Sequence, residues 1–299
     1  MHTADGSIHP ARPFDFSHSL RFMRSFRPCR DEQHVDDHGI TKAVMIAGRP
    51  IVFTVHPATP TSLHYIVAGE DPIDPCLQLV AQDRIRFFLG TDDDLTGFYE
   101  IAARDAAFAP LAERMRGFHQ VKFMTPFENT VWAVLGQHIQ LHVAQGMKRR
   151  FVERFGTKVE KDGREHWAFP APRTIAELAS SAIAGVIRNE RKARSIAAVA
   201  KAFCTIDESF LRRGDHAEVF EWLQSIEGIG EWSASFVMTR GLGRMERVRA
   251  FPPLIDAASQ VYGKLLSKKE FAALAQRYGP WQGYWAFYLR SAAAVNARA

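Results

Sequence analysis

Short apolar segments separated by turn residues dominate the N-terminal part of the chain. The segments are residues 43–47, 50–55 and 63–67, and β-branched residues are frequent in them. Such runs, bounded by turn residues such as those at 48–49, are typical of an antiparallel β-meander. A helix over residues 17–26 would place its apolar residues against one face of this sheet. The pattern therefore predicts a β-rich domain with at least one covering helix.

Helical periodicity replaces this pattern further along the chain. Thr125, Pro126 and Glu128 stand in the order of a helix N-cap, a first-turn proline and a capping-box glutamate, and they precede an apolar helix. The charge run at 91–94 is typical of a solvated helix N-terminus, although tandem carboxylates also occur in metal sites. We expect an α+β fold, with an N-terminal antiparallel β-sheet domain followed by a mainly α-helical region.

The patterns divide the chain into three segments. Residues 1–11 are polar and rich in His, Gly and Pro, which is typical of a flexible N-terminal tail. Residues 12–105 form the predicted β-rich domain. Residues 106–299 form the predicted helical region, which contains a hairpin of two helices at 219–240.

The predicted hairpin turns at Gly228, Ile229 and Gly230. Glycine permits positive φ and leaves one side of the turn free of side chains, so backbone N–H groups at the start of the second helix can face an anion. A phosphate is the predicted ligand. The alternative is an ordinary helix connection in which Ile229 fills the core.

Composition narrows the class of protein. The 38 Lys and Arg residues exceed the 33 Asp and Glu residues, which gives a net charge of +5 and suits a polyanionic partner without proving one. No apolar run approaches a transmembrane length, so we expect a cytoplasmic protein without a membrane partner. The 3 cysteines are widely spaced and form no CxxC pair. We therefore expect no disulfide, metal or redox cofactor.

Three sequence landmarks resemble one protein family. GIGEWSA at 228–234, followed by Arg240 and Gly241, resembles the helix-hairpin-helix signature of base-excision DNA glycosylases, in particular the alkylpurine branch typified by DNA-3-methyladenine glycosylase II. PFENTVWAVLGQH at 126–138 and GPWQGYWAFYL at 279–289 resemble two further family segments, in the family order. The resemblance implies a monomeric DNA repair protein that flips a damaged, alkylated purine out of duplex DNA. It also implies that the turn at 228–230 binds a DNA phosphate, with a monovalent cation held by the carbonyls of the turn when DNA is bound.

A loop of the family enters the minor groove and fills the space of the extruded base. By resemblance, this loop comprises Gln137, His138, Ile139 and the residues up to Leu141. Ile139 or Leu141 would be the apolar wedge, and Gln137 or His138 would face the orphaned partner base. The alternative is a plain connection between two core helices.

Aromatic residues are the candidates for the base pocket. Trp232 and Trp281 would offer faces on which an electron-poor alkylated purine stacks, with Phe127 and Tyr284 as further lining residues. Core packing is the alternative for each of them. Lys192, at a predicted helix start, is a candidate phosphate contact, and solvation at the surface is its alternative.

The catalytic residue is the point at which the chain departs from the family. Family members carry an Asp after the hairpin that stabilises the oxocarbenium-like sugar or activates water. In this chain the Asp position falls on Pro252, which can hold no charge. Asp256 follows about one helical turn later, ~6 Å along a helix axis, and is the remaining candidate. Its alternative is a surface or capping carboxylate.

Three functional hypotheses follow from these residues. The first is a monofunctional N-glycosylase that hydrolyses the glycosidic bond without strand cleavage. The second is a glycosylase-like protein, catalytically weak or inactive, that binds damaged or distorted DNA. The third is a fold relative that acts on something other than duplex DNA.

Overall fold

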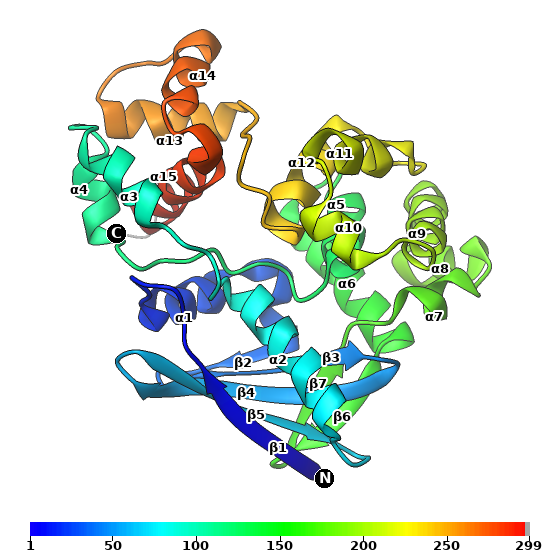
Figure 1. The fold of residues 1–299 in the computed structure, drawn as a ribbon. Helices are drawn as coiled ribbons and strands as arrows, with labels where there is room; N and C mark the ends of the chain where they lie inside the picture. Colours follow the sequence, from blue (N-terminus) through cyan, green and yellow to red (C-terminus); the bar gives the residue numbers. More distant parts are fainter. Residues whose placement is uncertain (297–299) are drawn as a thin grey trace.

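The computed structural model describes residues 1–296 and places a β-sheet below two groups of helices (Figure 1). The strands of the sheet are β1 (His2–Ile8), β2 (Gln33–Val35), β3 (Ile40–Ile46), β4 (Arg49–Thr59) and β5 (Ser62–Gly69). Their order is β1-β5-β4-β3-β2, and every neighbouring pair is antiparallel. The predicted fold class, an antiparallel sheet followed by a mainly helical region, is therefore confirmed.

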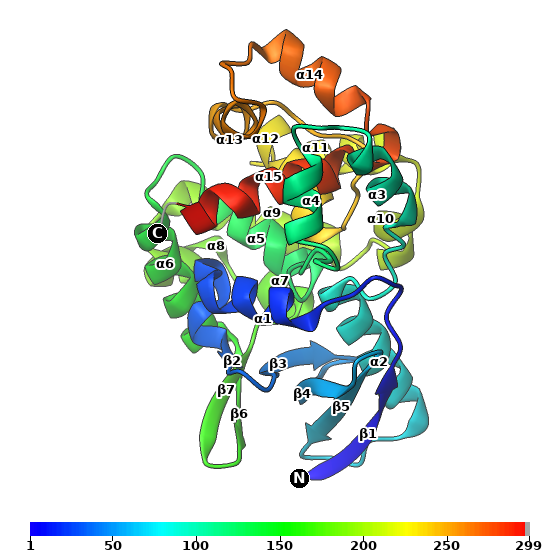
Figure 2. The same cartoon turned by 90° about the vertical axis from the view of Figure 1, so that its left-hand side faces the viewer.

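The side chains of the sheet alternate between two covered faces. Ile51, Phe53 and Val55 of β4 pack against the helices of the N-terminal domain. These helices are α1 (Phe16–Ser25) and α2 (Pro75–Leu89), and the 3₁₀ helix η1 (Arg27–Glu32) follows α1 along the chain. Side-chain caps begin both helices. Asp15 accepts a hydrogen bond from the backbone N–H of Ser17 at the start of α1, and Asp74 accepts one from that of Leu77 at the start of α2. Helix α1 lies between the sheet and the helical groups (Figure 2).

The first residues of the chain correct one prediction. Residues 2–8 were expected in a flexible tail, but they form the edge strand β1 and pair with β5 from His2 opposite Gly69 to Ile8 opposite Leu63. Ile8 is the one fully buried side chain of the strand. Backbone hydrogen bonds therefore make most of the strand's contacts, which explains why hydrophobic patterning gave no signal.

A second β-hairpin interrupts the helical region, in which only helices were expected. It consists of β6 (Thr157–Lys161) and β7 (Arg164–Ala168). Asp162 and Gly163 connect the strands with φ of 54° and 70°, the left-handed conformation that suits a tight hairpin. Val159 of this hairpin packs with Val52 on the face of the sheet opposite α1 and α2. The hairpin therefore joins the helical region to the sheet.

The remaining helices form two groups on different sides of the molecule (Figure 1). One group contains α3 (Thr96–Ala103), α4 (Ala109–Arg114), α13 (Pro252–Tyr262), α14 (Lys268–Gln276), η3 (Gly279–Trp281) and α15 (Gln282–Asn296). The other contains α5 (Pro126–Leu135), α6 (Leu141–Phe155), α7 (Pro172–Ala176), α8 (Ser180–Ile187), α9 (Glu190–Phe203), α10 (Glu208–Arg213), α11 (His216–Ser225), α12 (Glu231–Phe236) and η2 (Val237–Gly241). Helix α3 packs with the C-terminal helices, although the predicted boundary at residue 105 assigns it to the N-terminal domain. Within residues 1–296, no helix combines the length and the apolar character that crossing a membrane requires.

A buried ion cluster lies where the N-terminal domain meets α5 and α6. The Lys148 ammonium donates to Glu128 at 2.7 Å and to Glu32 at 2.8 Å, and its nitrogen lies 3.7 Å from the Cys29 sulfur. Cys29, Glu32 and Glu128 are also the one group of three potential metal ligands in the part of the chain that the structure describes. Lys148 contacts all three, and the buried ammonium of Lys42 lies 3.6 Å from Glu32, so internal ammonium groups supply the positive charge there.

Candidate nucleic-acid interface

The predicted hairpin is formed by α11 and α12, joined by residues 226–230. Gly228 has φ of 87°, and a Cβ at this position would lie 2.0 Å from the Ser195 hydroxyl of α9. Only glycine fits there, because both the conformation and the close approach exclude a side chain. A Cβ on Gly230 would meet nothing within 4 Å. The two glycines therefore differ: Gly228 packs the hairpin onto α9, and Gly230 faces open space.

The start of α12 has the features of an anion site. Gly230 is its N-cap, so no side chain caps its first turn. The N–H groups of that turn and the positive end of the helix dipole favour a negative ligand. Glu231 lies in this turn, but its carboxylate is paired with Arg249. Ile229 is buried in the core below the turn, so it fills the core while Gly230 leaves the helix start open.

A loop at residues 137–141, here named the insertion loop, is tied directly to the hairpin. The Gln137 side-chain amide donates to the Gly228 carbonyl at 2.8 Å and to the Ser233 hydroxyl at 3.0 Å. The amide that was expected to face an orphaned base is therefore used inside the protein. These two hydrogen bonds therefore connect the insertion loop to the turn at residues 226–230.

Lys192 of α9 also contacts the segment where α5 ends and the insertion loop begins. Its ammonium donates to the backbone carbonyls of Val134 at 2.7 Å and Gln137 at 2.8 Å, and the residue is buried. Burial, with a smaller contribution from Arg191, lowers the pKa of Lys192 to about 8. The structure therefore places Lys192 at the C-terminal carbonyls of α5, where a cation is favourable, and away from any exposed phosphate position.

The tip of the insertion loop is exposed. His138 has φ of 54° and an exposed side chain, and Leu141, at the start of α6, is 43% exposed. Ile139 packs against the core instead. Of the residues expected to enter DNA, His138 and Leu141 are free to do so.

An aromatic series runs inward from the hairpin. Trp232 is 48% exposed and stacks on Phe236 of the same helix, with ring centroids 5.5 Å apart. Phe236 contacts Phe123, and Phe123 contacts Phe26 at the end of α1, with centroid distances of 6.3 and 5.3 Å. The series offers a stacking surface that begins at the exposed edge of Trp232 and ends between the two groups of helices.

Comparison with known proteins connects this geometry to a family. No family model matches the chain. The DNA-3-methyladenine glycosylase of Bacillus subtilis (strain 168) is 28% identical over 290 residues, which cover 92% of this chain and 93% of that protein. DNA-3-methyladenine glycosylase 2 of Escherichia coli (strain K12) is 22% identical over 273 residues, covering 91% and 92%. These full-length relatives support the helix-hairpin-helix DNA glycosylases, and their alkylpurine branch, as the family that this chain resembles.

Solved glycosylase structures share the fold. The 3-methyladenine DNA-glycosylase from Archaeoglobus fulgidus aligns with a TM-score of 0.79 at 22% identity and covers 95% of this chain and 97% of its own. An 8-oxoguanine glycosylase/lyase from Clostridium acetobutylicum, in complex with double-stranded DNA, aligns with a TM-score of 0.68 at 14% identity, covering 89% and 88%. At these identities the likeness establishes the fold alone.

The structure disperses the other aromatic residues that were expected to line the glycosylase base pocket. Tyr284 is 1% exposed, and its hydroxyl donates to Asp93, so it belongs to the core. Trp281 contacts Tyr284 edge-on at 6.1 Å and packs beside Gly97 of α3. Trp281 and Trp232 share no aromatic neighbour among the described residues. Trp232 thus stands in the exposed series without Trp281 opposite it.

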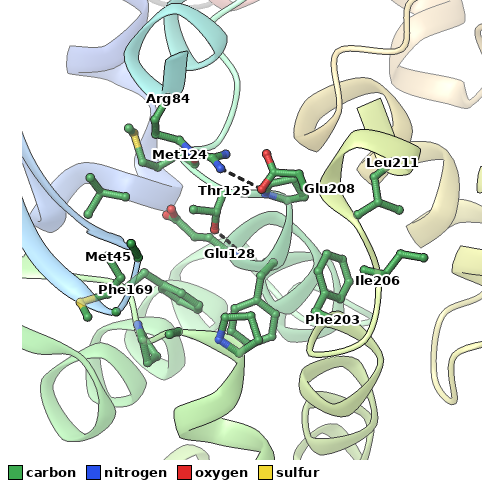
Figure 3. A pocket seen from close by; sticks show the side chains of 18 of the residues that line it. Met45, Arg84, Met124, Thr125, Glu128, Phe169, Phe203, Ile206, Glu208 and Leu211 are labelled. Atoms are coloured by element: carbon green, nitrogen blue, oxygen red, sulfur yellow. Dashed lines mark hydrogen bonds and ion pairs between the residues drawn. The ribbon is translucent and has the colours of Figure 1, made fainter. Parts of the chain in front are cut away.

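Phe127 lines a different space from Trp232. It borders a cavity of about 310 Å³ between the sheet and the helical region, together with Arg84, Glu208 and Phe203 (Figure 3). The cavity adjoins the N-terminal end of α5, whereas the insertion loop follows its C-terminal end, ~15 Å away at 1.5 Å per residue. The structure therefore separates Phe127 from the hairpin surface.

The segment in which the resemblance places the family's Asp lies at the start of α13. Pro252 is the first residue of the helix and is exposed, after Phe251 as N-cap. Asp256 is exposed four residues later. Residues four apart share a helix face. Asp256 therefore presents a carboxylate on the same face as Pro252, one turn further along.

Proposed function

We propose that this protein is a monofunctional DNA N-glycosylase that flips a damaged, alkylated purine out of duplex DNA and hydrolyses its glycosidic bond. One observation carries the proposal: Gln137 joins the uncapped start of α12 to the exposed insertion loop. A phosphate bound at the turn thereby fixes the position at which His138 and Leu141 meet the duplex. The names of the relatives support the class of lesion.

The roles of this chain's residues follow from that arrangement. The N–H groups beyond Gly230 bind a backbone phosphate and set the register of the duplex. His138 and Leu141 fill the gap of the extruded nucleotide, which offsets part of the few kcal/mol that unstacking costs. The extruded base stacks on Trp232. Strand cleavage is not expected, because no lysine stands beside the turn as in bifunctional relatives and Lys192 is committed to carbonyls.

Hydrolysis requires a negative charge near the sugar as the bond from C1′ to the base breaks. The bonding electron pair leaves with the base, and a carboxylate stabilises the positive sugar until water adds. Asp256 is the candidate for this role, because it shares the exposed face of Pro252. A second function, damage recognition with little or no hydrolysis, is favoured by Pro252 itself.

Single-turnover excision from a duplex containing one N3-methyladenine, followed by alkali cleavage of abasic sites, tests the proposal. We expect slow excision by the native chain. Asp256→Asn should lower the rate by ~10²–10³-fold, the usual cost of losing one preorganised electrostatic group, without changing DNA affinity.

Two results of these excision assays would contradict the proposed catalytic role of Asp256 or the proposed hydrolysis. Full activity of Asp256→Asn would make Asp256 a surface carboxylate. A native chain without activity that gains excision from Pro252→Asp would support damage recognition without hydrolysis. Pro252 is exposed at the first position of α13, so its replacement is compatible with the fold.

A further inference from the structure

Two histidines lie directly opposite each other on neighbouring strands of the N-terminal sheet. His56 of β4 pairs with His64 of β5, and the Nε2 atom of His56 lies 3.1 Å from the Nδ1 atom of His64. The second nitrogen of each ring faces an oxygen atom. For His64 this is a carboxylate oxygen of Asp5 in β1, at 3.0 Å, and for His56 it is the carbonyl oxygen of Pro57, at 3.2 Å. Three strands thus contribute to one row of polar groups.

The histidine pair lies on the face of the sheet opposite α1 and α2. Side chains of a strand alternate between the two faces, so His56 shares the face of Val52, on which the β6–β7 hairpin packs. Both histidines are half-buried, with the His64 side chain 28% exposed. The sheet lies at the end of the molecule away from α11 and α12 (Figure 1). The ring nitrogens are therefore accessible to a small solute and separate from the proposed DNA interface.

The two rings carry too few protons for the contacts that they make. A neutral imidazole has one N–H donor and one lone pair, so two neutral rings offer two protons for three close contacts. If each ring donates to its oxygen, the lone pairs of His56 and His64 face each other at 3.1 Å. If His56 donates to His64 instead, its other lone pair faces the Pro57 carbonyl. A cation shared by the two facing nitrogens removes this conflict.

We propose that His56 and His64 bind one divalent transition-metal ion, with Asp5 as a positioning residue. Imidazole nitrogen is a preferred ligand of Zn²⁺, and a tetrahedral zinc ion ~2.0–2.1 Å from two nitrogens holds them ~3.3 Å apart. The separation of 3.1 Å between the facing nitrogens is close to that value. Water molecules complete the coordination. The site is independent of the proposed DNA function.

The outer contacts of the two rings support this assignment. A metal-binding histidine usually donates its second N–H to a carboxylate or a backbone carbonyl, which fixes the tautomer and the orientation of the ring. The carboxylate of Asp5 and the carbonyl of Pro57 stand at these positions. Mg²⁺ and Ca²⁺ are poor candidates because they require oxygen ligands. The bound ion would join β4 to β5 directly and to the edge strand β1 through Asp5.

Titration of Zn²⁺ into the metal-free full-length protein, measured by isothermal titration calorimetry, tests the site. Asp5→Asn should lower zinc affinity by ~10-fold, because the ring of His64 loses its orienting acceptor. His56→Asn and His64→Asn should each lower the affinity further, because each removes one of the two ligands. His38→Asn, which removes an exposed histidine of the same domain, should keep the native affinity.

Unfolding temperatures separate a metal site from a structural histidine pair. In EDTA, the native chain and the four variants should unfold at the same temperature. Excess Zn²⁺ should raise the unfolding temperature of the native chain and of His38→Asn, and leave that of the two ligand variants unchanged.

Two results would overturn the metal site. Native zinc affinity in both His56→Asn and His64→Asn would place the ion elsewhere on the protein. Lower unfolding temperatures of these two variants in EDTA, without a zinc-dependent rise in the native chain, would assign the pair to the stability of the sheet alone.

Discussion

Gly228 and Gly230 stand two residues apart in one turn, yet different physical requirements select them. Gly228 combines a left-handed backbone with contact to Ser195, so its requirement is internal. Gly230 has an ordinary φ of −86° and open space beside it, so the fold itself does not demand glycine. The absence of a side chain at Gly230 matters only to something that approaches from outside.

Substitutions at these two positions should therefore separate stability from DNA binding. Gly228→Ala should destabilise the protein by ~2 kcal/mol or more, because alanine must adopt a strained backbone and displace Ser195. Gly230→Asp should unfold at the native temperature but bind undamaged duplex more weakly, because its carboxylate faces the phosphate. Thermal unfolding and duplex titration measure the two effects. Unchanged affinity of a folded Gly230→Asp protein would exclude the turn as a phosphate site.

The residue roles that sequence reasoning missed all depend on distant partners. Lys192 and Gln137 bear donors that suit DNA, and only the fold shows that backbone carbonyls and Ser233 take them up. Arg240 was visible as part of a motif, but its cation–π contacts with Phe22 and Phe287 require rings from both ends of the chain. The glycines could be read from the sequence because their constraint lies in the local turn.

At the scale of elements, α5, α9 and the hairpin meet at one junction. Lys192 from α9 closes the C-terminal end of α5, Gln137 connects that end to the turn, and Ser195 packs beneath Gly228. The insertion loop therefore has little freedom to move independently of the phosphate-binding turn. DNA contact at the turn should therefore restrict the motion of the insertion loop, and contact at the insertion loop should restrict the turn.

Lys192→Met should loosen the contact between α9, the C-terminal end of α5 and the insertion loop. The carbonyls of Val134 and Gln137 lose their donor, so amide hydrogen exchange should accelerate in both the insertion loop and residues 226–231. Preference for an abasic-analogue duplex over undamaged duplex should fall, while affinity for undamaged duplex stays within about twofold. Hydrogen exchange read by mass spectrometry and fluorescence titration measure these effects.

Lys201→Met provides the matched control, because Lys201 is an exposed lysine on the same helix. It should reproduce the native exchange pattern and the native duplex preference. An equal loss of both duplex affinities in Lys192→Met would instead indicate a phosphate contact by Lys192.

The elements that the sequence predicted best have local signals. The alternating strands β3, β4 and β5 and the Thr125 cap of α5 were predictable because side-chain pattern and capping chemistry lie within a few residues. Strand β1 was missed because its stability comes from backbone pairing with β5. The β6–β7 hairpin carried a turn signal at Asp162 and Gly163, but a surrounding helical pattern obscured it.

At the scale of the whole molecule, the buried ion cluster joins the N-terminal domain to the helical region. Burial raises the pKa of Glu128, but the ammonium groups of Lys148 and Lys42, with a hydrogen bond from Cys29, together outweigh that effect and hold the pKa at about 2. Glu32 of η1 shares the same ammonium. The contact between the parts of the protein therefore includes a charge network that must be complete to be stable.

Removal of one charged residue from the buried ion cluster should lower the free energy of unfolding. Glu128→Gln leaves Lys148 with less compensation and should lower the free energy of unfolding by ~3–5 kcal/mol. Glu128→Gln combined with Lys148→Met should recover part of this loss, because the pair leaves together. Chemical denaturation of the three proteins measures the coupling. Additive losses in the double variant would contradict a shared network.

The pH dependence of the single variant provides an independent check. A carboxyl whose folded pKa lies below its ordinary value of 4.5 contributes stability above pH 4.5 and loses it as the pH falls towards 2. The stability difference between the native chain and Glu128→Gln should therefore be constant near neutrality and shrink below pH 4.5. A difference that grows with acidity would contradict the assignment.

The position of β1 at the edge of the sheet bears on the order of folding. Its partner β5 lies far along the chain, so closing the intervening loop costs more entropy than forming the adjacent hairpins of β3, β4 and β5. The sheet should therefore assemble first from its central strands, and β1 should dock late. Until it docks, β5 has an open edge, and this interval is the stage of folding at which the chain is most exposed to intermolecular strand pairing.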